Sequence, residues 1–275
     1  MINSRIDWCD STWNPISGCL HGCEYCYARD IAHRFGGWTD SDGDTHHDEI
    51  LKNESKVREL DEPLRVFREG QTIFSGKRQK APYPYDFIPT FHRYRLNDYI
   101  GKKGRNIFVC SMSDLFGKWV PDEWIKEVFA ACEKAPQHNY LFLTKNPQRY
   151  IDLAVLEKLP TKENMWYGST MTEPDMKSFF SKYHKTFWSI EPILKPFRRM
   201  EESKKRLPDW IIVGAETGRR KDKIIPKREW IEDILEDCRQ RNTPLFMKSS
   251  LADIWGEPLI QEFPEGLERR NDEKL

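Results

Sequence analysis

From about residue 85 onward, short runs rich in β-branched and aromatic residues alternate with longer amphipathic segments. This alternation is typical of strand–helix units repeated around a parallel sheet. The expected strands span residues 85–91, 106–112, 139–145, 165–171, 186–192, 209–216 and 244–249, with a short N-terminal strand in 11–16. These eight segments predict an α/β fold with a TIM-like (β/α) barrel, full or partial.

Two of the intervening segments show the period of a helix with one buried face. Residues 121–136 place Trp124, Ile125, Val128, Phe129 and Cys132 on one side, and residues 227–242 align Trp230, Ile231, Ile234, Leu235 and Cys238. We therefore expect Cys132 and Cys238 to be core residues.

Residues 36–84 interrupt this rhythm with a polar stretch rich in glycine and charge, which indicates a long insertion after the first helix. Residues 265–275 are expected to form a flexible tail. A chain of 275 residues suits one large barrel domain over 1–275.

Lys plus Arg equals Asp plus Glu at 44 each, so no global charge favours nucleic acid or an anionic membrane. Basic clusters occur locally at 76–80, 101–105 and 218–223. The chain shows neither a secretory signal pattern nor an apolar run long enough to span a membrane, so we expect a cytoplasmic protein.

Three of the seven cysteines, Cys19, Cys23 and Cys26, stand within eight positions. Clustered thiols in a reducing compartment more often bind metal or do redox chemistry than form structural disulfides. The C-x3-C-x2-C motif follows the first expected strand and opens a helix, so the thiols should lie at the mouth of the barrel where such folds place their chemistry.

Several sites compete for these thiols. Zinc needs a fourth ligand, for which Cys9, His21 or His33 could serve. A thioredoxin-like pair would leave Cys19 unused, and covalent haem would need a histidine where the chain has Tyr27. An iron–sulfur cluster with three protein ligands and one open iron fits best.

The loop "CLHGCEYCYA", with an aromatic residue directly before the last cysteine, resembles the signature of the radical S-adenosylmethionine superfamily. The resemblance implies that Cys19, Cys23 and Cys26 ligate a [4Fe-4S] cluster and that S-adenosyl-L-methionine chelates the fourth iron. One electron would then split the cofactor into methionine and a 5'-deoxyadenosyl radical, which takes hydrogen from a substrate. Tyr25 would lie against the adenine side of the cofactor.

A second resemblance covers nearly the whole chain. The series "TWNPISGC", "FVCSMSDLF", "FLTKNPQR", "SIEPIL", "DWIIVGAETG" and "PLFMKSS" resembles a phage-associated bacterial family of three-cysteine proteins of unknown function. Members of that family commonly have more residues between the first two cysteines. The shorter spacing here is the standard spacing of the radical S-adenosylmethionine superfamily, which favours the interpretation that the cysteines hold its cluster.

Polar residues at the carboxyl ends of barrel strands should face the cofactor and substrate. The candidates for cofactor binding are Ser111, Ser113, Asp114 and Thr144, and those for catalysis are Cys110, Lys145, Glu191, Glu216 and Lys248; Ser169 and Thr170 share the same position.

Each candidate has a structural alternative. The serines and Asp114 could bind ribose hydroxyls or cap loops. Lys145 could pair with the methionine carboxylate of the cofactor, with a substrate anion, or with a carboxylate of the fold itself. Glu191 and Glu216 could bind the cofactor amino group or a substrate base. Glu191 and Lys248 could pair with each other across the barrel. Cys110 could return hydrogen to a substrate radical or be a core thiol.

The superfamily often carries a Gly-Gly-Glu element after its second strand. Here that region reads "PTFHRYRLND", which leaves His92 or Arg93 to take its place.

The expected partners are a reducing electron donor such as flavodoxin or ferredoxin and, from the basic loops and the phage association, a nucleic acid or nucleotide substrate. A noncatalytic zinc or iron–sulfur module that recognises a partner is the alternative function.

Overall fold

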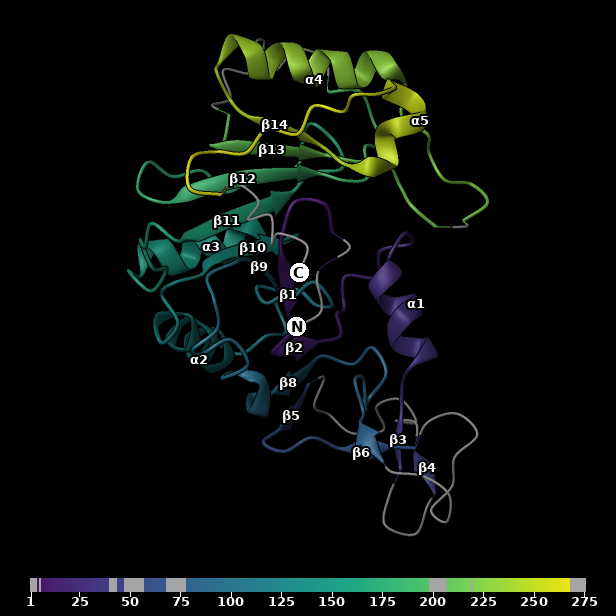
Figure 1. Ribbon diagram of the computed structural model, residues 1–275, viewed down its shortest axis with the longest axis vertical. Helices are drawn as coiled ribbons and strands as arrows, with labels where there is room; N and C mark the ends of the chain where they lie inside the picture. Colours follow the sequence, from purple (N-terminus) through teal and green to yellow (C-terminus); the bar gives the residue numbers. More distant parts are fainter. Residues whose placement is uncertain are drawn as a thin grey trace. The chain divides into compact units, whose positions relative to one another are not determined.

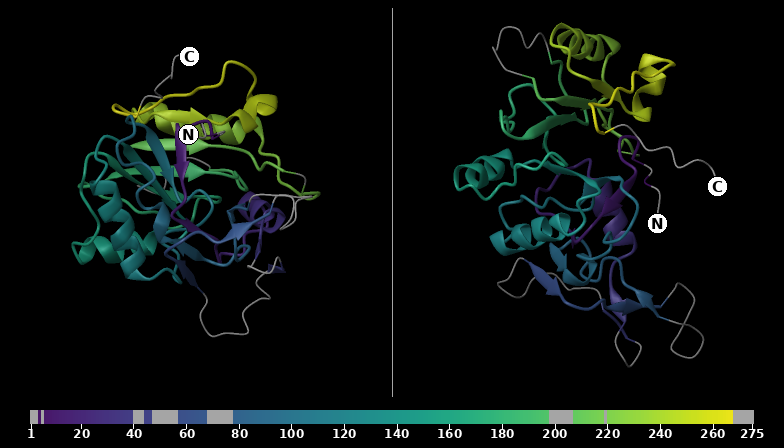
Figure 2. Two further views of the ribbon diagram at one scale, coloured as in Figure 1. Left: turned by 60° about the horizontal axis from the view of Figure 1, so that its bottom comes forward. Right: turned by 60° about the vertical axis from the view of Figure 1, so that its left-hand side comes forward.

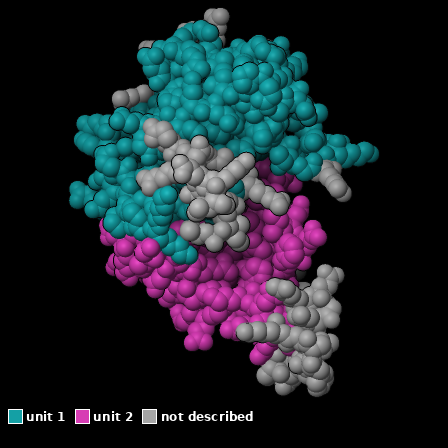
Figure 3. Space-filling view, viewed as in Figure 1, with its two compact units in different colours: residues 1–12, 102–109, 136–275 teal, residues 13–101, 110–135 magenta. Residues whose placement is uncertain are grey.

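The computed structural model describes residues 4, 6–39, 44–46, 57–67, 78–197, 207–218 and 220–267. The chain divides into two compact units, which are coloured separately in Figure 3. Unit 1 contains residues 1–12, 102–109 and 136–275, and unit 2 contains residues 13–101 and 110–135.

A curled seven-stranded sheet forms the centre of unit 1 (Figure 1). Its strands follow the order β1 (Ser11–Trp13), β9 (Asn106–Val109), β10 (Asn139–Thr144), β11 (Met165–Thr170), β12 (Lys185–Ile190), β13 (Trp210–Val213) and β14 (Leu245–Met247). The pairings from β9 to β14 are all parallel, and neighbours in sequence pair in space. The order is that of half a barrel built from repeated strand–helix units.

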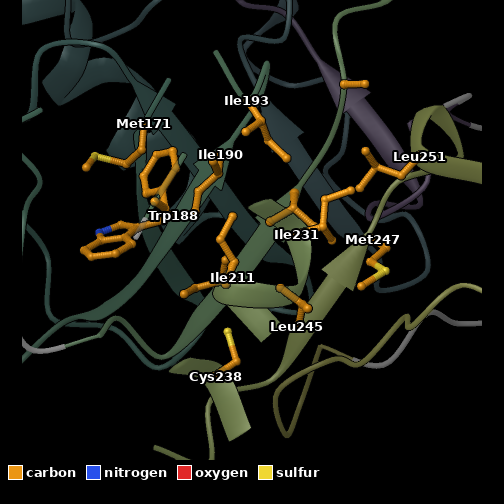
Figure 4. Close-up of a cluster of buried hydrophobic side chains, with 14 of the residues drawn as sticks. Met171, Trp188, Ile190, Ile193, Ile211, Ile231, Cys238, Leu245, Met247 and Leu251 are labelled. Carbon is orange, nitrogen blue, oxygen red and sulfur yellow. The ribbon is translucent and has the colours of Figure 1, made fainter. Parts of the chain in front are cut away.

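Both faces of this sheet are buried, because successive side chains of a strand point to opposite sides. In β13, Ile211 and Val213 join one apolar cluster, and Trp210 and Ile212 join another. Figure 4 shows part of the first cluster, where Ile211 and Leu245 of the sheet lie near Ile231 and Cys238 of a helix. This double burial explains why the strands are almost continuously apolar.

The helices described in unit 1 are α3 (Pro147–Val155), α4 (Arg228–Gln240) and α5 (Ala252–Trp255), with a 3-10 turn η3 at Ser249–Leu251. Helix α4 buries Ile231, Ile234 and Cys238 on the face that the sequence period predicts. Figure 2 shows the backbone from two further directions, with α4 and α5 at the yellow-green end of the colour scale. None of the described helices combines the length and the apolar character needed to cross a membrane.

Unit 2 is built from shorter pieces. It contains α1 (Tyr27–Arg34), α2 (Asp122–Glu133), the 3-10 turn η1 (Arg93–Arg95) and the strands β2 (Ile16–Ser17), β3 (Trp38–Thr39), β4 (Thr45–His46), β5 (Arg58–Leu60), β6 (Arg65–Val66), β7 (Gln79–Lys80) and β8 (Thr90–His92). Strands β2, β8 and β5 form one sheet, while β3–β4 and β6–β7 are separate pairs. Helix α2 buries the expected stripe, Cys132 included.

One expected barrel strand is placed differently. The segment 85–91 contributes only the start of β8, which pairs antiparallel with β2 and parallel with β5 instead of entering the seven-stranded sheet. Pro89 and the turns before it limit the extended stretch, since proline cannot donate to a sheet ladder. Within 36–84, β5 completes this small sheet; residues 40–43, 47–56 and 68–77 lie outside the described residues, as do 268–275 of the expected tail.

Candidate metal centre

The three clustered cysteines lie in one loop of unit 2, between β2 and α1. Cys19, Cys23 and Cys26 are each partly exposed. Cys26 occupies the N-cap position of α1, where no side chain caps the helix. A helix N-terminus favours negative charge, because its first N–H groups lack partners within the helix. The end of the loop is therefore suited to a thiolate or to an anionic group bound by one.

Gly18 fixes the start of this loop. Its φ is +82°, and a Cβ at this position would come within 2.3 Å of the Ile88 carbonyl oxygen, so only glycine fits. The Gly18 N–H donates to the Met112 carbonyl (3.0 Å), and the Cys19 N–H donates to the Phe87 carbonyl (3.1 Å). The backbone leading into the first cysteine is thus held from two sides.

Residues 110–114 support the loop through hydrogen bonds. The Ser113 hydroxyl donates to the Gly18 carbonyl (2.6 Å), and the Ser111 carbonyl accepts from the Tyr27 hydroxyl (2.9 Å). The Ser111 hydroxyl donates to Asn14 Oδ1 (3.1 Å), which also accepts from the Met112 N–H (3.0 Å). The expected cofactor-binding serines therefore lie against the cysteine loop, with bonds that also suit loop capping.

Asp114 is buried and contacts the loop directly. Its Oδ2 lies 2.7 Å from Nε2 of His21, between the first two cysteines, and its Oδ1 accepts from the Phe116 N–H (3.0 Å). Tyr25, the residue expected beside adenine, is partly buried in the turn before Cys26.

The surroundings of Cys19 affect the ionisation of its thiol. Burial raises the pKa of the Cys19 thiol to about 12, while a hydrogen bond from the His21 backbone opposes the increase. Negative charge on Asp114, Cys23 and Cys26 raises this pKa further. A bound metal centre would reverse this balance, since positive charge stabilises the thiolate.

Among the described residues, no three His, Cys, Asp or Glu side chains converge as the ligands of a single metal ion do. In a four-iron cluster each thiolate binds a different iron, so its sulfur atoms need not point at one centre as zinc ligands must. The loop fits such a cluster in donor type, donor number and partial exposure.

The residues considered as a fourth zinc ligand have other surroundings. Cys9 is buried in an aromatic cluster of unit 1, with its sulfur 3.4 Å from the Ser4 hydroxyl. His21 contacts Asp114, and His33 is exposed on α1.

Apart from Cys110, the remaining catalytic candidates belong to unit 1. Glu191 and Lys248 form an ion pair, as the structural alternative expects, and Gly214 makes room for it because a Cβ there would come within 3.1 Å of Lys248 Cδ. Glu216 forms a two-point ion pair with Arg220, both contacts being 2.7 Å, and Arg220 lowers the pKa of that carboxyl.

Thr144 is buried at the end of β10, where its hydroxyl accepts from the Asn146 N–H (2.9 Å), and Lys145 beside it is partly exposed. The Ser169 hydroxyl accepts from the Phe179 N–H (2.9 Å), ten residues further along the chain, and Thr170 is buried.

Cys110 lies in unit 2 with 2 % of its surface exposed, and its backbone is left-handed, with φ of +59°. Burial raises the pKa of its thiol to about 12. Its N–H donates to the Trp13 carbonyl (2.7 Å).

The two residues proposed in place of the Gly-Gly-Glu element both have partners within the fold. His92 is fully buried, with Nε2 2.8 Å from the Ser17 hydroxyl and Nδ1 3.2 Å from the Tyr94 hydroxyl. Arg93 pairs with three carboxylates, those of Glu59, Asp61 and Glu127.

Two residues of the site have only weak signals in the sequence. Asn14 precedes a proline, a pairing that favours a turn but does not reveal that its side chain accepts bonds from residues nearly a hundred positions away. Trp119 stacks edge-on against His21 with ring centroids 4.9 Å apart. Only the folded chain identifies this contact.

Comparison with known proteins gives one match. Searches of curated proteins and of solved structures found none. A family model described as "Protein of unknown function (DUF5131)" matches residues 3–262. Since that match spans nearly the whole sequence, the chain belongs to the DUF5131 family.

Proposed function

We propose that the protein is a radical S-adenosylmethionine enzyme in which Cys19, Cys23 and Cys26 hold a [4Fe-4S] cluster. The observation that carries the proposal is the cysteine loop: three partly exposed thiols in one backbone-anchored segment, the last of them at the N-cap of α1. Three thiol ligands leave one iron of such a cluster open.

The residues around the loop have separate tasks in this proposal. Gly18 and Ser113 hold the backbone before the first ligand, and the N-terminus of α1 favours negative charge at the last one. Buried apolar side chains, Phe87 and Met112 among them, pack against Cys19 and Cys26 and limit the access of water to them. Tyr25, Ser111 and Asp114 remain the candidates for contact with the cofactor.

When bound, the cluster and S-adenosyl-L-methionine supply a 5'-deoxyadenosyl radical that removes hydrogen from a substrate. The electron comes from a reduced flavodoxin or ferredoxin in this proposal. The chain itself contributes ligands, orientation and a site with little water.

The proposed catalytic groups differ in how firmly neighbouring residues hold them. Glu191 and Lys248 present opposite charges at the ends of β12 and β14 and could receive a zwitterionic or anionic group by exchanging partners. Glu216 is held by Arg220, and Lys145 stays a candidate at the end of β10. Cys110 keeps its hydrogen at neutral pH, but its burial favours a core role over hydrogen donation.

A nucleic acid or nucleotide substrate remains a proposal. It is supported by exposed lysines in two of the basic loops, Lys102 and Lys103 in one and Lys221 and Lys223 in the other. Arg220 of the second loop is neutralised by Glu216, which weakens that support. Gel shifts at increasing salt concentration measure whether DNA or RNA binds through phosphate contacts.

Anaerobic reconstitution tests the function. Wild-type protein treated with iron, sulfide and dithionite should hold about four irons per chain and release 5'-deoxyadenosine from S-adenosylmethionine. Cys19→Ala should lose both signals. Cys238→Ala is the matched control, because it removes a core thiol of α4 outside the cysteine loop and should keep the iron.

Two outcomes oppose the proposal. Equal iron content and equal 5'-deoxyadenosine release in Cys19→Ala would show that the loop is not the metal site. One zinc per wild-type chain, with no binding of S-adenosylmethionine, would instead support a noncatalytic metal-binding module.

A further inference from the structure

His21 stands between the first two cysteines and reaches across unit 2 to a residue 93 positions away. Its Nε2 lies 2.7 Å from Oδ2 of Asp114, and 19 % of its side chain is exposed. A carboxylate oxygen accepts hydrogen bonds, so Nε2 carries the hydrogen. Asp114 is itself held, because its other oxygen accepts from the Phe116 N–H. The imidazole is thus tied to a fixed point.

Trp119 holds the same ring by packing. The two ring planes meet at 76°, with centroids 4.9 Å apart. Gly117 allows this placement, since a Cβ there would lie 2.4 Å from the indole ring. The indole Nε1 is buried and has no hydrogen-bond partner among the described residues. Trp119 therefore stabilises His21 through ring contact and not through its N–H.

The backbone of His21 also opposes the rise in the pKa of the Cys19 thiol, two residues before it. Beyond it, Gly22 has φ of +70° and would have no atom within 4 Å of an added Cβ, so packing there does not restrain the loop. The side chain of His21 is consequently the anchor of the segment between Cys19 and Cys23.

We propose that His21 is a positioning residue: its ring, held by Asp114 and Trp119, fixes the loop between the first two proposed metal ligands. The loop-anchoring part stands on the geometry of the chain alone. The effect on a cluster rests on the proposed function. In this role Asp114 supports the metal site from behind the first ligands, as outer partners of metal ligands commonly do.

Thiol alkylation of the metal-free protein tests the anchoring. With iodoacetamide and mass spectrometry, His21→Ala should react severalfold faster than wild type at Cys19 and Cys23, because the loop opens more often. His21→Gln should restore slow alkylation, since its amide can donate to Asp114 from nearly the place of Nε2. Trp119→Phe is a milder variant: it keeps an aromatic ring but loses the unpartnered N–H and part of the indole surface, so its rates should stay closer to wild type than those of His21→Ala.

Unchanged alkylation of Cys19 and Cys23 in His21→Ala would overturn the anchoring. Should that variant fail to fold, Asp114→Asn gives a milder change, because the amide oxygen can still accept from Phe116 while its bond to His21 is weakened. It should accelerate alkylation in the same direction by a smaller factor, and wild-type rates in folded Asp114→Asn would also contradict the proposal.

Reconstituted protein tests the effect on the cluster. His21→Ala should bind iron about 10–100-fold more weakly than wild type, the usual cost of losing an outer partner of a metal ligand. Once loaded, it should show an altered EPR line shape and a shifted reduction potential, because the loop no longer fixes the sulfur atoms of the first two proposed ligands. His21→Gln should recover most of the affinity and the wild-type spectrum.

The two proposals fail in different ways. If wild type takes up no iron while His21→Ala still speeds alkylation, the iron–sulfur function is wrong and the anchoring stands. If wild type forms the cluster and His21→Ala matches it in affinity, EPR line shape and potential, the positioning role is wrong and the proposed function stands.

Discussion

The two units use different means to hold a backbone in place. In unit 1, strands β9 to β14 pair in sequence order, and apolar side chains cover both faces of the sheet. In unit 2, strands of two or three residues alternate with loops that single polar side chains fasten to the backbone. Asn14, Ser113 and Asp114 each bond a main-chain group in this way.

This difference decides how each unit should respond to substitution. Apolar burial is shared among many residues, so unit 1 should depend on volume and tolerate changes that preserve it. A side chain that satisfies one specific backbone group cannot be replaced by a neighbour. The candidate metal site lies in the unit of the second kind, so its geometry should be sensitive to single residues.

The largest expected effect comes from the core of unit 1. Trp210 is fully buried and contacts the rings of Trp8, Phe187, Phe246 and Phe263. Trp210→Ala should lower the free energy of unfolding by about 3–5 kcal/mol, the usual cost of a large cavity. Urea unfolding measures it.

Ile225→Ala is the control for that measurement. The isoleucine is 66 % exposed, so its loss should change stability by less than about 0.5 kcal/mol. Equal losses of unfolding free energy in Trp210→Ala and Ile225→Ala would show that apolar burial does not dominate the stability of unit 1.

The same difference explains what the sequence could predict. The period of residues 121–136 and 227–242 correctly places Cys132 and Cys238 in the core, because a helix face is a local property of the chain. Six of the seven strands of the large sheet lie within their expected segments, and β12 begins one residue before its segment, because the alternation of residue types is also local. The prediction for 85–91 is wrong about the sheet, since the pairing of β8 with β2 and β5 is long-range.

In the candidate site, too, local features of the sequence could be predicted and long-range contacts could not. The three cysteines are visible as a motif, whereas the bonds of Asn14 and the contact of Trp119 with His21 join residues 97 and 98 positions apart. Nothing in their local sequence reports such pairs. The Glu191–Lys248 ion pair was foreseen only because both residues end strands of one parallel sheet.

The next effect concerns acid stability and unit 2. Burial, with the positive charge of Arg95 adding to it, lowers the pKa of His92 to about 2. In the unfolded chain this histidine titrates near 6.5, so below that pH the unfolded state binds a proton that the folded state excludes. The stability contributed by neutral His92 is complete above pH 6.5 and falls by about 1.4 kcal/mol per pH unit below it, or about 2 kcal/mol by pH 5.

His92→Gln checks this prediction, because glutamine can still hydrogen-bond Ser17 and Tyr94 but does not titrate. Urea unfolding between pH 7.5 and 5 should give this variant a flatter pH dependence, whatever its stability at pH 7.5. Parallel curves for the variant and wild type would mean that the buried histidine does not govern the acid response.

The smallest expected effect is the coupling free energy of the Glu191–Lys248 ion pair, which measures whether unit 1 also depends on a single polar contact. Glu191 and Lys248 keep 24 % and 16 % of their side chains exposed, so solvent screens their attraction in part. A double-mutant cycle with Glu191→Gln and Lys248→Met should give a coupling free energy of about 1 kcal/mol. The Arg228–Glu232 pair on α4 is the comparison, and its greater exposure should reduce the coupling to about 0.3–0.5 kcal/mol.

A coupling well above 2 kcal/mol at Glu191–Lys248 would remove the contrast between the units. A small coupling together with lost 5'-deoxyadenosine release in Glu191→Gln would separate the two roles of the pair, because stability would then be nearly intact while the chemistry depends on the carboxylate.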